Sequence, residues 1–263
     1  MGVGWPLERT DRRGRSLTFA VDGSGPWLLL PWCNVNWFDF SDLSVLSREH
    51  TVIVASPLGF GASGRAEPDA YRLDELLDDL LHVCSAVGAD RFDVFGYSLT
   101  GALVAALGCA SDRVRSAMAG GFPLLGSYAA VRNDAERLIG DPDFVAGISD
   151  AFDAAAVIAV YRDLAQLADG DLVDRRRCRM AACWGDDDTV LRAFDSSADL
   201  AAELAGRDVD VVRLEGLGHD RLLLHIDEVL RLTSAWFMDP QPMSSPRRAR
   251  PSHDELNPRS SPS

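Results

Sequence analysis

The feature that most constrains the fold is a regular alternation of short β-rich segments with helical periodicities along the chain. Segment 51–55, TVIVA, is a continuous run of apolar, mostly β-branched residues, which is typical of a strand buried on both faces of a sheet. Residues 71–87 place Leu, Val and Cys side chains at helical spacing, and Gly88 predicts the end of that helix. Such alternation favours parallel βαβ units over a β-sandwich. We therefore expect an α/β fold with a mostly parallel, doubly wound sheet.

The same alternation continues to residue 238, with one interruption at residues 122–177. That stretch is helical in pattern and rich in Ala and Asp, and we interpret it as a small helical lid inserted over the sheet. The other expected strands are 16–22, 27–31, 92–96, 114–119, 179–184 and 209–214, and the other expected helices are 99–109, 191–205 and 222–238.

The C-terminal segment differs from the rest in composition. From Asp239 onward the chain holds six prolines and many serines, without apolar periodicity. A segment of this kind cannot bury enough apolar surface to offset the entropy of ordering it. We expect one domain over residues 1–239 and a disordered tail, rich in Pro, Ser and Arg, over residues 240–263.

Net charge, hydropathy and cysteine spacing indicate which partners, metal sites and cellular locations to expect. The formal net charge is −14, and an acidic surface repels phosphate backbones and anionic lipid headgroups, so we expect neither nucleic acid nor a membrane as partner. The N-terminus lacks the apolar core of a secretory signal, and no apolar run approaches membrane-spanning length. The five cysteines show neither CxxC nor zinc-ligand spacing. We expect a cytoplasmic protein without a metal, and its oligomeric state stays open.

A candidate nucleophile lies in the segment FDVFGYSLTG, from Phe92 to Gly101, which has the pattern of a strand turning sharply into a helix. Such a turn lifts the Ser98 hydroxyl clear of the sheet, and Gly96 lets the backbone pass closely. Here the chain resembles the α/β-hydrolase family, whose nucleophile elbow reads G-x-S-x-G. Thr100 stands where the second glycine is usual. The resemblance implies that Ser98 is a nucleophile; the alternative is a small polar residue at an ordinary strand–helix junction.

The chain order of the family, nucleophile then acid then histidine, points to the other two groups. The expected strand 179–184 is followed by Gly-Asp-Asp-Asp, which resembles the family's G-x-x-D and implies Asp188 as the acid, with Asp186 and Asp187 as alternatives. His219, after the expected strand 209–214, resembles the histidine of the family's G-H-D element and is the implied base. Together with a loop at 56–63 similar to D-x-x-G-x-G-x-S, the resemblance covers about residues 7–238.

The resemblance is weaker at the oxyanion hole. The family's third strand is commonly followed by His-Gly, and the next residue donates a backbone N–H to the oxyanion, whereas this chain has Pro31 and Trp32 there. An Asn34 or Asn36 amide could add a hydrogen bond. The alternative is a loop packed by its tryptophans. The implied oxyanion donors are Cys33 and Leu99, and the expected substrate contacts are Trp32, Asn34 and Tyr97.

Three functions fit these motifs. The first is hydrolysis of an ester-like bond of a small molecule (a carboxylic ester, lactone or thioester) through an acyl-enzyme. The second is a cofactor-free oxygenase of the same fold, suggested by the Trp32-Cys33 pair. The third is a non-catalytic protein that binds a small molecule. None of the three implies a cofactor, and fold alone does not name the substrate.

Overall fold

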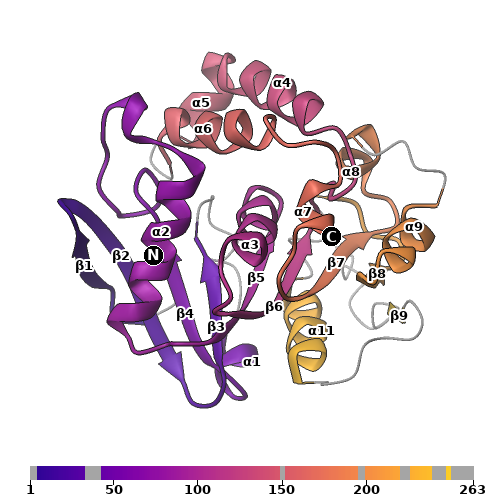
Figure 1. Ribbon diagram of the computed structural model, residues 1–263, viewed down its shortest axis with the longest axis horizontal. Coiled ribbons are helices and arrows are strands. Elements are labelled where there is room, and N and C mark those ends of the chain that lie inside the picture. The colour runs from indigo at the N-terminus through magenta and orange to yellow at the C-terminus, as the bar shows by residue number, and fades with distance from the viewer. Residues whose placement is uncertain are drawn as a thin grey trace, which may run out of the picture.

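The computed structural model describes residues 5–32, 43–148, 152–194, 199–219, 226–238 and 247–249. Within these residues one sheet has the strand order β1-β2-β4-β3-β5-β6-β7-β8-β9 (Figure 1). β2 pairs antiparallel with β1 and β4, and the pairings from β4 through β3 to β9 are parallel, as expected. The strands are β1 (Glu8–Arg12), β2 (Arg15–Gly23), β3 (Trp27–Pro31), β4 (Thr51–Ser56), β5 (Phe92–Tyr97), β6 (Val114–Gly120), β7 (Arg179–Gly185), β8 (Asp210–Leu214) and β9 (Arg247–Ala249).

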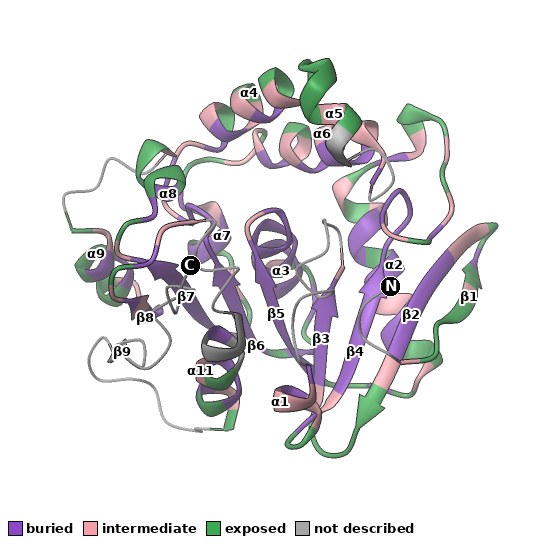
Figure 2. Cartoon of the chain, turned by 180° about the vertical axis from the view of Figure 1, so that it is seen from behind, coloured by how far each residue is buried: buried purple, intermediate pink, exposed green. Residues whose placement is uncertain are grey.

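Helices cover both faces of this sheet, so the doubly wound arrangement is confirmed (Figure 2). On one face, leucines and alanines of α2 (Leu73–Ala86) and α3 (Leu99–Ala110) pack into the larger apolar core. On the other face, α1 (Ser44–Ser47) and α11 (Ile226–Met238) contribute Leu46, Val229 and Trp236 to a second core. Burying both faces accounts for the long apolar runs of the central strands.

β5 shows how the sequence divides side chains between the two cores. All six of its residues are buried. Phe92 and Val94 belong to the core under α2 and α3, whereas Phe95 and Tyr97 belong to the core under α1 and α11. Successive side chains of a strand point to opposite faces, so this alternation fixes the direction of every side chain up to the turn at Ser98.

The segment between β6 and β7 is helical, as expected. It contains α4 (Tyr128–Ile139), α5 (Pro142–Ile148), α6 (Ala154–Leu164) and α7 (Asp171–Asp174), with α4 and α6 side by side above the sheet (Figure 1). Asp153 connects the start of α6 to the residues around β4 and α2. Its N–H donates to Gly59 O at 2.7 Å, and its carboxylate accepts from Ala155 N–H and from the Tyr71 hydroxyl. Whether the segment acts as a lid stays a prediction.

Two strands were not expected. β1, with the sequence ERTDR, has no apolar pattern, and it is held by backbone pairing to β2 and by ion pairs of Arg12 with carboxylates of α2. The expectation of a fully disordered tail is wrong for Arg247–Ala249, which pair parallel with Val212–Leu214. The outer edge of β8 offers backbone hydrogen-bonding groups, and a passing segment can pair with them whatever its side chains. The rest of 240–263 lies outside the described residues.

The expected helix 191–205 is two helices, α8 (Thr189–Phe194) and α9 (Leu200–Gly206), with residues 195–198 outside the described part. The Asp199 side chain caps the N-terminus of α9 by accepting a hydrogen bond from Ala202 N–H. A second helix therefore begins within the segment that the sequence pattern predicts as a single helix. A short 3₁₀ helix, η2 (Pro68–Ala70), precedes α2. Within the described residues, no helix combines the length and the hydropathy needed to cross a bilayer.

Candidate active site

Three of the predicted side chains meet at the carboxyl ends of the parallel strands. Ser98 directly follows β5, Asp188 follows β7, and His219 follows β8. His219 Nε2 lies 3.2 Å from Ser98 Oγ, and His219 Nδ1 lies 2.9 Å from Asp188 Oδ2. The imidazole therefore bridges the hydroxyl and the carboxylate in one hydrogen-bonded chain. Ligands and reacting groups of open α/β sheets gather at this edge, because loops from several strands converge there.

The backbone at Ser98 has an unusual conformation. Its φ and ψ are 57° and −121°, a region that side-chain-bearing residues rarely adopt. Ser98 is the residue immediately before α3, and its N–H donates to Gly120 O of β6 at 2.8 Å. A strained turn of this kind is held by its surroundings and is common where a side chain must be presented for reaction.

The three consecutive aspartates after β7 have different surroundings. Asp188 is fully buried, with Oδ2 facing His219 and Oδ1 accepting from Leu191 N–H at 2.8 Å. Asp186 pairs with Arg213 at 2.6 Å, and Asp187 is exposed. Of the three alternatives, only Asp188 therefore contacts the histidine.

The loop that carries His219 is tied to the loop that carries Asp188. Asp187 N–H donates to Leu217 O at 2.9 Å. A Cβ at Gly185 would lie only 2.0 Å from the same carbonyl, so glycine is needed for this close approach. These contacts fix the distance between the carboxylate and the imidazole.

The prediction that Tyr97 contacts substrate is wrong. Tyr97 is 1% exposed, because strand alternation turns its side chain into the core under α1 and α11. Its ring lies 5.2 Å from the His219 ring, and its hydroxyl lies 3.3 Å from His219 O and 3.5 Å from Asp188 Oδ2. Tyr97 therefore packs behind the histidine and supports the site from within. The sequence pattern gave no signal for this role.

The oxyanion donors are described only in part. Leu99 is the first residue of α3, so its N–H lies in the first turn, where a helix offers no acceptor of its own. Cys33, Asn34 and Asn36 lie outside the described residues. Trp32 is half-buried, and its N–H donates to Ala55 O at 2.7 Å. The roles expected for these residues stay predictions.

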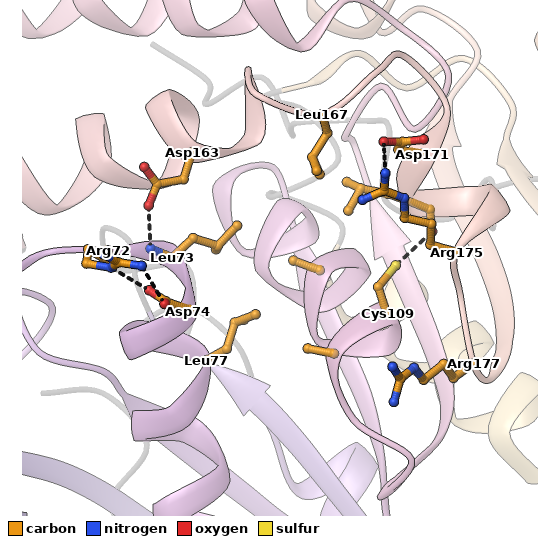
Figure 3. A pocket seen from close by; sticks show the side chains of 13 residues that line it. Arg72, Leu73, Asp74, Leu77, Cys109, Asp163, Leu167, Asp171, Arg175 and Arg177 are labelled. Atoms are coloured by element: carbon orange, nitrogen blue, oxygen red, sulfur yellow. Dashed lines mark hydrogen bonds and ion pairs between the residues drawn. The ribbon is translucent and has the colours of Figure 1, made fainter.

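A separate cavity of about 590 Å³ lies at the other end of α3 (Figure 3). Cys109 and Ala110 line it, whereas Ser98 precedes the first turn of this 12-residue helix, about 18 Å away at 1.5 Å per residue. Its arginines already pair with carboxylates: Arg72 with Asp74, Arg175 with Asp171, and Arg177 with Asp112. This cavity is therefore distinct from the serine–histidine site.

The cysteine thiols of the described residues are poor alternative nucleophiles. Burial raises the pKa of the Cys109 thiol to about 11 and that of Cys84 and Cys183 to about 12, so these thiols stay protonated near neutral pH. Among the described residues, no three His, Cys, Asp or Glu side chains are grouped to hold a metal ion. Among the described residues, Thr10 and Ser234 also lie within hydrogen-bonding distance of a histidine ring, but Ser98 lies at the carboxyl ends of the parallel strands, beside a histidine that is held by a buried carboxylate.

The fold and this arrangement of side chains define the class of protein. A family model for the alpha/beta hydrolase fold matches residues 30–137, which include the end of β3, all of β4, β5 and β6, and Ser98. The chain therefore has the α/β-hydrolase fold. No curated protein matches it in sequence.

Solved structures with different activities share this fold. E-2-(acetamidomethylene)succinate hydrolase is 17% identical with a TM-score of 0.69, over 89% of this chain and all of that one. The enol-lactonase of Burkholderia xenovorans is 16% identical with a TM-score of 0.64, over 88% of this chain and all of that one. An epoxide hydrolase of Vigna radiata is 12% identical with a TM-score of 0.67, over 89% and 97%. At such identities the likeness establishes the fold and leaves the reaction to the site.

Proposed function

We propose that the protein is a serine hydrolase that cleaves an ester-like bond of a small molecule (a carboxylic ester, lactone or thioester) through an acyl-enzyme. The observation that carries this proposal is the chain Ser98 Oγ to His219 Nε2 at 3.2 Å and His219 Nδ1 to Asp188 Oδ2 at 2.9 Å, built on a strained turn. A hydroxyl, a base and an orienting carboxylate in this order are what nucleophilic catalysis by serine requires.

The geometry supports a definite order of steps. Ser98 Oγ attacks the carbonyl carbon, and His219 Nε2 takes its proton and then gives it to the leaving group. Asp188 accepts the Nδ1–H, which fixes the tautomer that leaves Nε2 free to act as the base. The Leu99 N–H, at the positive end of α3, is a donor for the oxyanion. Water, activated by the same histidine, then releases the acid and restores Ser98.

The competing functions have less support. The oxygenase hypothesis depends on the Trp32-Cys33 pair, and Cys33 lies outside the described residues. A protein that only binds its ligand has no need for a strained serine aligned with a histidine and a fully buried carboxylate. The enol-lactonase of similar structure is consistent with ester-like chemistry on this fold.

Covalent labelling tests the proposal. A fluorophosphonate should add once to the wild-type protein, and peptide mass analysis should locate the adduct on Ser98. Ser98→Ala should not label, and its ester turnover should fall by about 10⁴-fold or more. Ser85→Ala, a change at an exposed serine of α2, is the matched control and should behave as wild type. Full labelling of Ser98→Ala would refute the assignment of the nucleophile.

A further inference from the structure

We propose that the Thr100 hydroxyl is a positioning group that holds the Ser98 turn in its reactive conformation; this inference rests on the proposed function. Thr100 Oγ1 accepts a hydrogen bond from Tyr97 N–H at 2.7 Å and donates one to Tyr97 C=O at 3.0 Å. Thr100, the second residue of α3, therefore binds both the N–H and the C=O of Tyr97, the residue that precedes Ser98. Glycine, which is usual at this place in the family's motif, has no side chain to make either contact.

The two groups that Thr100 binds lie at the end of β5, next to the turn at Ser98. Ser98 N–H points to β6, so the alternation of a strand turns Tyr97 N–H toward β3. In the described residues β3 and β5 pair only at Leu28 with Asp93 and at Leu29 with Val94, so Tyr97 lies three residues beyond the last pair. The Thr100 hydrogen bonds therefore act at the last residue of β5, directly before Ser98.

Burial makes the two hydrogen bonds hard to replace. Thr100 is 0% exposed and Tyr97 is 1% exposed, so bulk water cannot reach this side of the turn. Buried backbone groups that lose a partner carry the full desolvation penalty. A methyl group in the place of Oγ1 would also be too large for contacts of 2.7 and 3.0 Å, so the end of β5 would have to shift.

Neighbouring glycines make room for the threonine. A Cβ at Gly96 would lie 2.4 Å from Thr100 O and 2.8 Å from Thr100 Oγ1. A Cβ at Gly101 would lie 2.7 Å from Gly120 O, so the close contact between α3 and β6 occurs at position 101. Gly101 therefore allows the close approach of α3 to β6 although Thr100 replaces the second glycine of G-x-S-x-G. The Thr100 hydroxyl adds two hydrogen bonds to the turn.

The link to the reaction is the position of Ser98 Oγ. Ser98 holds an unfavourable conformation and is fixed on one side by its bond to Gly120 O and on the other by the Thr100 contacts to Tyr97. If Tyr97 relaxes, the 3.2 Å contact between Ser98 Oγ and His219 Nε2 changes. A displacement of about 1 Å at a reacting group can cost on the order of 100-fold in rate.

Three variants separate positioning from general stability. Thr100→Val removes the hydroxyl with nearly the same volume, Thr100→Ser retains it, and Thr233→Val removes a buried hydroxyl that donates to Val229 O in α11, away from the site. At a temperature where all are folded, we expect Thr100→Val to slow fluorophosphonate labelling by about tenfold or more. Thr100→Ser and Thr233→Val should label close to the wild-type rate, even where Thr233→Val lowers the melting temperature.

Hydrogen exchange provides a readout that does not depend on activity. The Tyr97 amide should lose protection in Thr100→Val and keep it in Thr100→Ser. Wild-type labelling kinetics in folded Thr100→Val, or equal slowing in Thr233→Val, would overturn the positioning role. If the wild-type protein does not label at all, the proposed function fails, and a Tyr97 amide that stays protected in Thr100→Val would refute the contact itself.

Discussion

The carboxylates after β7 allow a test at the scale of single residues. Asp188→Asn retains the size of the side chain but replaces the acceptor of the His219 Nδ1–H by a neutral amide, which can stabilise the wrong tautomer. We expect kcat/KM for an ester to fall by more than about 100-fold. Asp187→Asn, at an exposed carboxylate, should change it by less than about twofold.

Asp186→Asn is the matched control for Asp188→Asn. Asp186 pairs with Arg213 and does not contact His219, so its substitution should affect the stability of the loop more than turnover. Steady-state kinetics and thermal unfolding of the three variants compare these effects directly. A loss of turnover confined to Asp186→Asn or Asp187→Asn would contradict the geometry of the site.

The three residues of the candidate site were predictable because each lies at a fixed place relative to a strand end. Ser98, Asp188 and His219 follow three apolar strands, and parallel strands bring their carboxyl ends together. Tyr97 was misassigned because its surroundings come from the loops of Asp188 and His219, which lie far along the chain. A motif specifies local geometry and does not show which distant segment will cover a side chain.

At the scale of elements, His50 joins the loop between α1 and β4 to helix α11. It is fully buried; its Nε2 lies 3.1 Å from Ser234 Oγ, and Ser234 donates to Glu49. Burial lowers the pKa of His50 below the ordinary 6.5, against the opposing effect of the Asp93 and Glu49 carboxylates and with a smaller contribution from Arg115. The folded protein therefore resists protonation of this imidazole more than the unfolded chain does.

The sign of the resulting pH dependence follows from linkage. A group whose pKa is lowered by folding contributes stability above its unfolded pKa, near 6.5, and that stability is lost as the pH falls through the folded value. Urea unfolding between about pH 7.5 and 5.5 should show a falling free energy of unfolding in the wild type. His50→Gln should flatten this dependence, whereas His82→Gln, at a half-buried histidine of α2, should leave it intact. Equal slopes in wild type and His50→Gln would show that other groups cause the effect.

Elements were predictable where apolar patterning specified them. β4 and β5 are apolar because both faces of the sheet are covered, and α2 is amphipathic because it covers one of them. β1 and β9 have the sequences ERTDR and RRA and form through backbone pairing at the two edges of the sheet. Neither sequence has an apolar pattern that would predict a strand. Backbone pairing at an edge depends on a neighbouring strand and not on the side chains of the segment itself.

At the scale of the whole molecule, the net charge of −14 bears on the choice of substrate. Glu136 of α4, Asp143 of α5 and Asp141 between these helices add exposed carboxylates, which Arg132 and Arg137 of α4 offset only in part. A field of this sign slows the approach of polyanions and hardly affects neutral molecules. The arginines that line the cavity at the far end of α3 already pair with aspartates, so they add little net attraction for phosphate.

We therefore expect a higher kcat/KM for a neutral medium-chain or aromatic ester than for the coenzyme A thioester of the same acyl group. The two substrates form the same acyl-enzyme, so a difference in kcat/KM reports on approach and acylation, and the polyanionic leaving group must enter against the negative field. Added salt screens that repulsion, because the Debye length falls from about 30 Å at 0.01 M to about 10 Å at 0.1 M. The thioester rate should rise over this range while the neutral ester rate stays nearly constant, which makes the ester the internal control for any effect of salt on the enzyme itself. A preferred thioester whose rate falls with salt would instead indicate a local cationic site that overrides the net charge.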